Sequence, residues 1–241
     1  MSKREPLSLL KSAVALLLVI GCLWAAQWQY HRGVDRHQRN NQIELRSDLP
    51  AISISDAVQD AASQEWRKVS ATGQFDPDRQ ILLRNRYFEG KYGFEALTAF
   101  QDSSGVEYWV DRGWVQAGEN ATIAPQIPPL PVGEVTIEGR LRLDRSLPQG
   151  KFFALPTGNK GGLISEANAQ ASNKEYGIDS TFYVDLLTGD HPELTPDVAA
   201  SLPELSDGPH FAYALQWIIF AGLVLYGRFL IRREVLTREE F

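Results

Sequence analysis

The sequence predicts a membrane α+β protein in which two terminal transmembrane helices enclose one β-rich, mostly antiparallel extracytoplasmic domain. Two apolar blocks near the chain ends predict the helices, because a helix needs roughly 20 apolar residues to cross the hydrocarbon core. Short alternating runs between these blocks, separated by turn signals, predict the strands. The single cysteine, Cys22, excludes an intrachain disulfide framework.

The first apolar block predicts a transmembrane helix at residues 7–30. No charged residue occurs from Ser12 to Tyr30, and Trp28 lies near the far end, where amphipathic rings prefer the membrane interface. A cleaved secretory signal is one alternative, but the small residues that signal peptidase prefers are missing around Ala26. A lipoprotein signal ending at Cys22 is another, and the apolar residues after Cys22 argue against it. We therefore expect an uncleaved helix.

The second apolar block predicts a transmembrane helix at residues 211–231. Basic residues lie before the first helix and after the second, so the positive-inside rule places both termini in the cytoplasm. This gives a cytoplasmic N-terminus at 1–6, a periplasmic domain at 31–210 and a cytoplasmic tail at 232–241. The short basic N-terminus, without a long transit segment, favours a bacterial inner membrane over a mitochondrion.

Three arginines conflict with this orientation, because they follow the first helix on its other side: Arg32, Arg36 and Arg39. The basic clusters at the two chain ends both favour cytoplasmic termini, and they outweigh the one cluster that does not. We therefore retain the orientation with both termini in the cytoplasm. The conflict suggests that these arginines have another role.

The middle of the chain is acidic. Between Tyr30 and His210 the basic residues number 17 and the acidic residues 26. A nucleic-acid partner is therefore excluded, since binding phosphates needs a basic face. The acidity favours a soluble domain held away from the lipid surface. Because Met1 is the only methionine and no C-x-x-C occurs, a copper chaperone is also excluded.

The middle segments divide into a helical extension, strands and a loop. The polar stretch Tyr30–Leu49 predicts a continuation of the first helix that ends before Pro50. Residues Pro148–Ile178 are rich in Gly, Asn, Ser and Ala and predict a long loop, with one short helix near Ser165–Ala171. Six segments predict strands: Trp66–Phe75, Gln80–Arg84, Tyr92–Phe100, Val106–Val115, Glu134–Leu143 and Thr181–Leu187.

The sequence offers few candidates for chemistry. It contains no G-x-S-x-G, no H-E-x-x-H and no histidine pair at zinc spacing, so we expect no enzyme. Asp111-Arg112-Gly113-Trp114 predicts a packing corner, in which Arg112 forms an ion pair with an acidic neighbour inside the sheet and Trp114 packs on Arg112.

His210 stands directly before the second apolar block. It is either a plain interfacial residue or a ligand, since neutral imidazole is a usual axial ligand of haem iron. A site at the membrane edge would suit an amphipathic porphyrin. Arg32 and Arg36 share a helical face with Trp28, and either form a solvated surface or pair with propionates or lipid phosphates. Gln216 is polar within an apolar block and is expected to face a partner helix or a ligand.

Six segments in one order resemble the Surf-one (surfeit locus protein one) family of cytochrome c oxidase assembly proteins. They resemble that family's W-Q-x-x-R, V-x-x-x-G-x-F-D, G-[YF] with T-P-[FL], V-N-R-G-W-V, V-x-V-E-G-x-x-R and G-P-H-x-x-Y-A-x-Q-W motifs. The matching segments are Trp28–Arg32, Val69–Asp76, Tyr92–Phe100, Val110–Val115, Val135–Arg142 and Gly208–Trp217. The chain departs from the family pattern at Ala99, where the family has proline, and in Lys151–Ser180.

The resemblance implies a membrane assembly factor for haem-copper cytochrome c oxidase that binds or delivers haem a to subunit I. It implies His210 as the iron ligand, and oxidase subunit I, other assembly factors and the lipid bilayer as partners. We add that Arg32 and Arg36 neutralise the propionates and that Gln216 and Trp217 line the helix interface. The alternative is a haem-free structural scaffold that stabilises oxidase subunits. A third possibility, an enzyme that acts on haem or lipid, is not supported by any set of catalytic residues in the sequence.

Overall fold

The computed structural model describes residues 7–118, 125–147, 154–156, 178 and 180–237. Its contacts divide the chain into two units. Met1–Gln42 together with Glu204–Phe241 form the first, which we call the helical unit. Ile43–Pro203 form the second, which we call the β unit.

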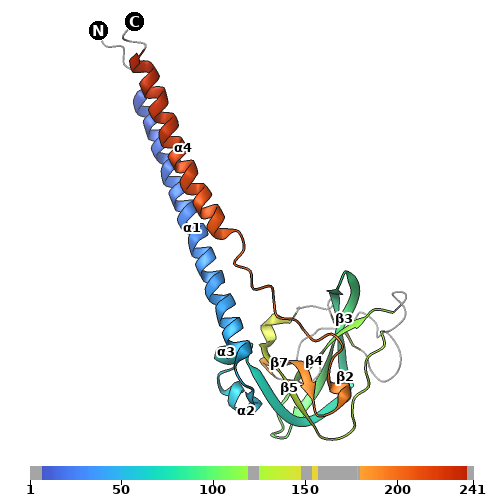
Figure 1. Ribbon diagram of the computed structural model, residues 1–241. Helices are drawn as coiled ribbons and strands as arrows, with labels where there is room; N and C mark the ends of the chain where they lie inside the picture. Colours follow the sequence, from blue (N-terminus) through green and yellow to red (C-terminus); the bar gives the residue numbers. More distant parts are fainter. Residues whose placement is uncertain (1–6, 119–124, 148–153, 157–177, 179, 238–241) are drawn as a thin grey trace. The chain divides into compact units, whose positions relative to one another are not determined.

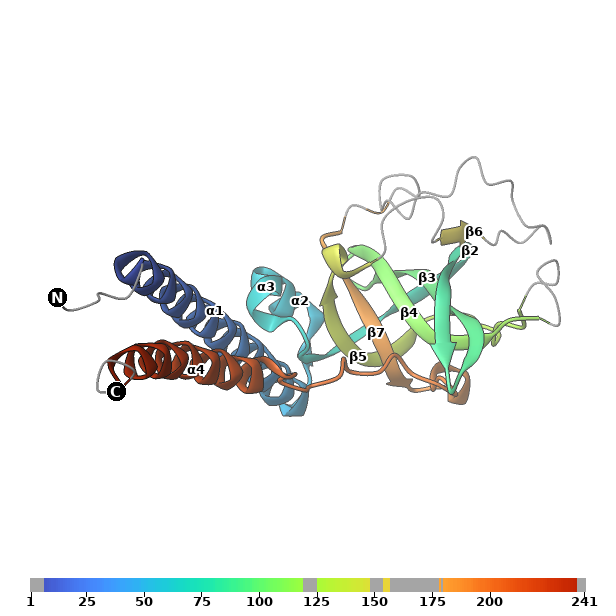
Figure 2. The same ribbon diagram turned by 90° about the horizontal axis from the view of Figure 1, so that it is seen from above.

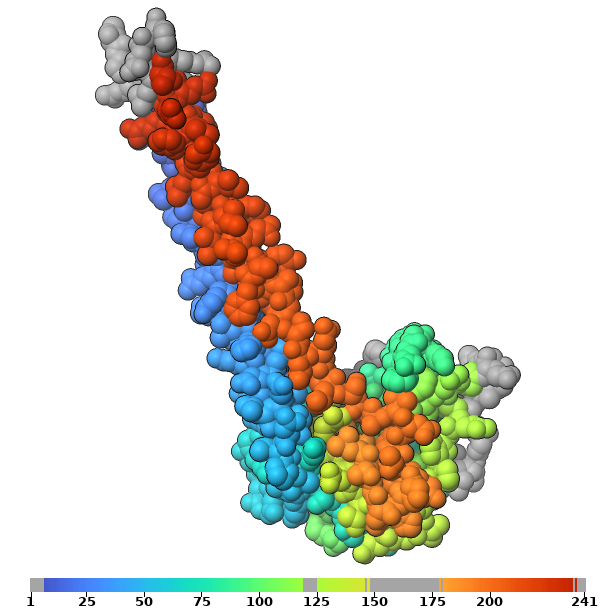
Figure 3. Space-filling model, viewed as in Figure 1, coloured from blue at the N-terminus to red at the C-terminus, as the bar shows by residue number. Residues whose placement is uncertain are grey.

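The helical unit consists of two long helices that lie side by side (Figures 1 and 3). Helix α1 runs without interruption over Ser8–Asp48, which confirms the predicted extension of the first apolar block. Helix α4 covers His210–Thr237. Both helices are long and apolar enough to cross a membrane, so the chain is a membrane protein with two candidate spans.

The contact between these helices uses small side chains. The least exposed side chains of this contact are Ala26, Ala214 and Ala221, each at most 7% exposed. Buried and half-buried positions of α4 recur at alternating steps of four and three residues: His210, Ala214, Trp217, Ala221 and Val224. This spacing is the seam of a left-handed helix pair, and small residues let the two backbones approach. Most large apolar side chains of both helices are exposed, as lipid contact requires.

The β unit is one sheet that curls round and closes on itself (Figure 2). Its hydrogen-bonded order is β1-β2-β3-β4-β7-β5, with an added β2–β5 pairing that closes the barrel-like sheet and β6 paired to β2. The strands are β1 (Ile52–Ser53), β2 (Lys68–Phe88), β3 (Lys91–Asp102), β4 (Glu107–Gln116), β5 (Val135–Leu143), β6 (Ala154–Pro156) and β7 (Phe182–Gly189). The short helices are α2 (Ile54–Ala57), η1 (Val58–Asp60), α3 (Ala61–Gln64), η2 (Asp144–Ser146) and η3 (Pro192–Leu194).

The prediction of a mostly antiparallel β-rich domain is confirmed, since only the β1–β2 and β4–β7 pairs among the described strands are parallel. The prediction of two separate strands at Trp66–Phe75 and Gln80–Arg84 is wrong. The chain bulges between Asp76 and Gln80, where its register with β3 shifts, and then continues as the same strand β2. The predicted long loop contains β6, and the helix predicted at Ser165–Ala171 lies outside the described residues.

The core of the β unit lies inside the closed sheet. One cluster of mutually packed apolar side chains draws on all five barrel strands and includes Val69, Phe100, Val110, Leu141 and Val184. Complete burial of each such side chain stabilises the fold by about 1.5–3 kcal/mol. Because neighbouring strand residues point to opposite faces, the alternate residues, such as Trp109, form a second cluster on the other face.

Candidate functional site

A glycine-proline turn places His210 at the start of α4. Gly208 has φ +66°, in the left-handed region where glycine is favoured, and its N–H donates to Ser206 Oγ at 3.1 Å. Pro209 follows, and its carbonyl oxygen accepts from Tyr213 N at 3.0 Å, which begins the helix. The sequence Gly-Pro-His therefore turns the chain and makes His210 the first helical residue.

His210 is tied to α1 by a single side-chain hydrogen bond. Its Nδ1 lies 2.9 Å from Gln29 Oε1, and both residues are half-buried. When Nδ1 donates to this oxygen, the neutral imidazole has its lone pair on Nε2. No hydrogen-bond partner of Nε2 occurs among the described residues. This arrangement fixes the ring against α1 and leaves one ring nitrogen able to act as a ligand.

The predicted arginines lie differently with respect to this turn. Arg36 Nε donates to Ser206 O at 2.5 Å, so the structure brings Arg36 to the segment that leads into His210. Arg32 is exposed, and its guanidinium carbon lies 5.6 Å from the centre of the Trp28 ring. The structure therefore joins Arg36, but not Arg32, to the turn through a hydrogen bond.

Two further side chains of α1 contact Asp207, which lies between Ser206 and the start of α4. His37 Nδ1 lies 2.9 Å from Asp207 Oδ2, and Asn40 Nδ2 donates to Asp207 Oδ1 at 3.3 Å. The turn before α4 is thus bound by three polar side chains on one face of α1: Arg36, His37 and Asn40. These contacts hold the start of α4 in one register against α1.

Gln216 and Trp217 lie further along α4. Gln216 is exposed, so it does not lie in the contact between the two helices, where the prediction placed it. Trp217 is half-buried on the seam and contacts Phe220 edge-to-face, with ring centres 5.7 Å apart. The structure does not bring either side chain to His210 by a hydrogen bond.

Gln29 is not among the predicted site residues, although it is the second letter of the W-Q-x-x-R motif. The four- and three-residue spacing of small side chains along α1 could have placed it on the seam. Gly33 was also missed. A Cβ at Gly33 would lie 2.9 Å from Phe211 Cζ, so glycine provides the space for that ring. Phe211 also contacts Tyr30 edge-to-face, with ring centres 5.9 Å apart.

A second polar contact joins the helices at their other ends. Arg228 Nη2 donates to Ser12 Oγ at 3.0 Å and to Ser8 Oγ at 3.1 Å. The guanidinium of Arg228 therefore bonds to α1 near the start of that helix. Between this contact and the Gln29–His210 contact, the facing surfaces of the two helices are apolar.

The β unit contains a buried charged cluster outside its apolar core. Asp185 is 1% exposed, and its Oδ2 accepts from Arg142 Nη1 at 3.1 Å and lies 4.0 Å from Arg140 Nε. The Arg142 guanidinium also stacks on Trp66, 3.7 Å from the ring centre. Burial raises the pKa of the Asp185 carboxyl, while the two guanidiniums oppose that shift. We interpret this cluster as a device that joins β7 to β5.

Asp111 is adjacent to this cluster and has no arginine bonded to it among the described residues. Its Oδ1 accepts from Gly113 N at 2.8 Å. Burial raises the pKa of the Asp111 carboxyl well above its ordinary value, and the nearby Glu95 and Asp185 charges add to that shift.

The prediction that Arg112 forms an ion pair inside the sheet is wrong for the described part of the chain. Its Nη2 donates to the carbonyl oxygens of Pro128 at 2.6 Å and Pro129 at 3.1 Å. Trp114 packs near Phe88 instead of on Arg112. Arg112 is on the opposite face of β4 from Asp111, because neighbouring strand residues alternate.

No group of three or more His, Cys, Asp or Glu side chains that could hold a metal ion occurs within the residues the structure describes. Among the described residues of the helical unit, His210 is a half-buried imidazole whose Nδ1 contacts an acceptor and whose Nε2 has no hydrogen-bond partner. One imidazole suffices as the protein ligand of a haem iron, whereas a bare zinc ion needs three or four.

Comparison with known proteins gives a consistent match. The profile of the SURF1 family matches residues 16–222, from α1 to α4. Similar relatives, from Mycobacterium bovis and two strains of Mycobacterium tuberculosis, are named uncharacterized SURF1-like proteins. Each is 32% identical over 211 residues, which cover 84% of this chain and 74% of the relative.

Proposed function

The chain belongs to the SURF1 family, and on that premise we propose that it binds haem a through His210 and delivers it to cytochrome c oxidase subunit I. The family is associated with cytochrome oxidase assembly. The finer assignment is our own. We propose that the protein acts without catalysing a reaction and has subunit I and other oxidase assembly factors as partners.

The contact between His210 and Gln29 is the observation that supports haem binding. Metal-bound histidines usually donate their other ring N–H to an acceptor, which fixes the tautomer and raises ligand basicity. Gln29 Oε1 lies 2.9 Å from Nδ1 and is such an acceptor. A purely interfacial histidine does not need its ring fixed in this way.

Haem a fits the residues around this imidazole. When bound, it would supply an iron that a neutral imidazole can ligate. His210 would hold that iron through Nε2. Arg36 is fixed by its Nε at the turn, and its terminal amino groups are suited to a propionate; Arg32 offers a second charge. The exposed face of α4 with Gln216 would adjoin the apolar ring.

We also propose the orientation. The basic residues at both chain ends favour cytoplasmic termini in a bacterial inner membrane, with the β unit in the periplasm. Modification by a membrane-impermeant reagent would test it. Cysteine introduced at the exposed Val132, in a chain whose Cys22 is serine, should react in intact spheroplasts. Reaction only after lysis would refute this orientation.

The visible spectrum of the detergent-purified protein tests the proposed function directly. The wild-type chain, made in cells that synthesise haem a, should show a haem a band that is lost in His210→Ala. Gln29→Leu should retain less haem and show a changed band, because the imidazole is no longer held as one tautomer. His191→Ala is the matched control, since His191 is an exposed histidine in a turn of the β unit, and its band should equal that of wild type.

Other outcomes separate the alternatives. No band in the wild type, with oxidase subunits co-purifying, would favour the haem-free scaffold. A band unchanged in His210→Ala would retain the haem and reject this ligand. Haem affinity that is unchanged in both Arg32→Ala and Arg36→Ala would reject their pairing with propionates.

A further inference from the structure

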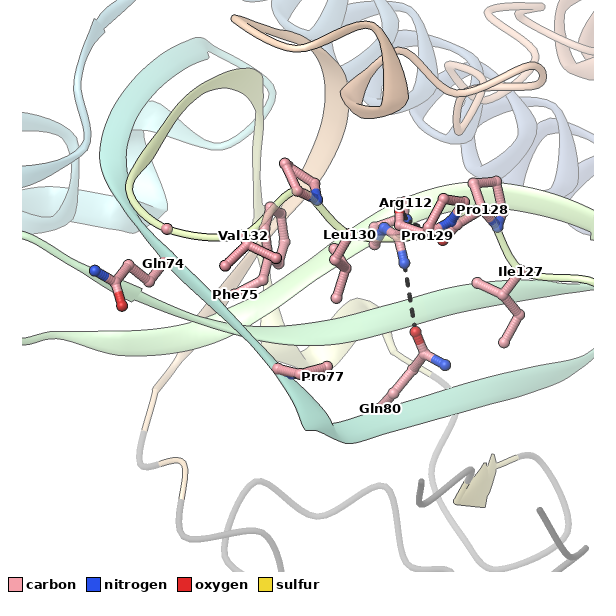
Figure 4. A pocket seen from close by; sticks show the side chains of 12 residues that line it. Gln74, Phe75, Pro77, Gln80, Arg112, Ile127, Pro128, Pro129, Leu130 and Val132 are labelled. Atoms are coloured by element: carbon pink, nitrogen blue, oxygen red, sulfur yellow. Dashed lines mark hydrogen bonds between the residues drawn. The ribbon is translucent and has the colours of Figure 1, made fainter. Parts of the chain in front are cut away.

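The β unit contains a pocket of about 460 Å³ that is separate from His210. One wall is β2, with Phe75, Pro77 and Gln80, and the opposite wall is the proline-rich segment 127–133 (Figure 4). Arg112, on β4, also lines the pocket. This volume is within the range of pockets that bind small molecules, about 300–1,000 Å³.

Arg112 lines this pocket with a charge that has no carboxylate partner in the described ranges of the chain. The residue is only 6% exposed. Its acceptors are neutral: two proline carbonyls and Gln80 Oε1, which lies 3.4 Å from Nη1. Its Nε is buried without a hydrogen-bond partner. Burial lowers the pKa of the guanidinium to about 10, and no neighbouring charge opposes this shift.

An isolated buried guanidinium is costly to the fold and is favourable for binding an anion. Moving a charge away from water is expensive unless an opposite charge compensates it. A carboxylate beside Arg112 would supply that charge and would form a charge-assisted hydrogen bond. The buried guanidinium therefore indicates a ligand that has a single negative charge.

The rest of the pocket indicates an apolar body for this ligand. Ile127, Leu130 and Val132 belong to one wall, and Phe75 belongs to the other. The wall also contains Pro128, Pro129 and Pro131. Since proline has no N–H, this wall lacks the row of backbone donors that pairs with an extended peptide. The chemistry favours a small amphipathic acid over a peptide terminus.

We propose that this pocket binds a monocarboxylate of the fatty-acid class, with its carboxylate against Arg112 and its alkyl chain between Phe75 and the proline-rich wall. Fatty acids partition into lipid bilayers, so a protein with two membrane-spanning helices can encounter them. The site does not depend on haem binding, because all of its residues belong to the β unit.

The test uses octanoate, titrated calorimetrically into the full-length protein in detergent. Octanoate should bind, whereas octanol, which lacks the charge, and acetate, which lacks the alkyl chain, should each bind at least about tenfold more weakly. Tenfold corresponds to about 1.4 kcal/mol. Equal binding of octanol would overturn the role of the charge. Tighter binding of an apolar N-acetyl dipeptide acid than of octanoate would overturn the fatty-acid assignment in favour of a peptide terminus.

Gln80→Glu is the decisive variant, because it places a carboxylate where Oε1 now accepts from Arg112. The variant should fold, with an unfolding temperature at or above that of wild type, yet lose octanoate binding by at least about tenfold. Titration of this variant in the same detergent also measures the heat of octanoate that enters the detergent, which is subtracted from the wild-type titration. Arg112→Gln should lose binding as well, and Arg145→Gln, which removes a mostly exposed arginine, should not. Unchanged binding in Gln80→Glu and Arg112→Gln would overturn the proposal.

Discussion

Replacing Asp185 with alanine is expected to destabilise the β unit by about 3–5 kcal/mol. The substitution removes the carboxylate that lies 3.1 Å from Arg142 Nη1 and 4.0 Å from Arg140 Nε. Both arginine side chains are at most 14% exposed, so water cannot replace the lost partner. The cost is mostly that of two buried guanidiniums that lose the carboxylate they contact, and a typical domain is only about 5–15 kcal/mol stable.

Denaturant unfolding of the full-length protein in detergent, followed by tryptophan emission, measures this cost. A double-mutant cycle with Arg142→Ala isolates the interaction, and the double variant should be more stable than the two single costs predict, by about 1–3 kcal/mol. Asp197→Ala is the control, since Asp197 is exposed. A cost below about 1 kcal/mol for Asp185→Ala, or strict additivity, would refute the reasoning that the carboxylate compensates buried charge.

Two further predictions concern Asp111 and Gly33. Burial raises the pKa of Asp111, so the folded carboxyl retains a proton that the unfolded chain has lost, and stability falls as pH rises from about 3.8 toward the raised value. Asp111→Asn should remove this dependence, which amounts to up to about 1.4 kcal/mol per pH unit. The free energy of unfolding of both proteins, measured from about pH 4 to 8, tests this. Parallel pH profiles of wild type and variant would contradict it. Gly33→Ala should lower the stability of the helix pair by about 1–3 kcal/mol because the new methyl group displaces the Phe211 ring. Gly222→Ala is the control, since a Cβ there meets nothing within 4 Å. Circular dichroism on heating measures the melting temperature of both variants, and equal melting temperatures would contradict the steric argument.

The architecture followed from local patterns in the sequence, and the contacts that matter for the site did not. A long uncharged apolar block predicts a helix, and alternation of apolar and polar residues predicts β4 and β5. Both patterns can be recognised because they involve residues that are close together in the sequence. Asp76-Pro77-Asp78, between the two predicted strands, has the composition of a turn. Pairing with β3 on both sides of the bulge instead keeps the chain in one strand.

The contacts of His210 and Arg112 could not be predicted, for two different reasons. The partner of His210 is 181 positions away at Gln29, and a single sequence has no local signal for such a pair. The acceptors of Arg112 are main-chain carbonyls, which every residue possesses, so composition could not identify them. A buried arginine usually pairs with a carboxylate, and none contacts Arg112 among the described residues.

The two polar contacts of the helix pair also set a length. From Ser12, which bonds to Arg228, to Gln29, which bonds to His210, the helix axis rises by about 26 Å at 1.5 Å per residue. Measured from Ser8, which Arg228 also contacts, the rise is about 32 Å, so the two values lie on either side of the roughly 30 Å of a typical hydrocarbon core. Because polar contacts at both ends oppose sliding of one helix along the other, the hairpin cannot lengthen to match a thicker bilayer. A bilayer of another thickness must adjust around the pair, so the pair should concentrate where the hydrocarbon thickness is close to this length.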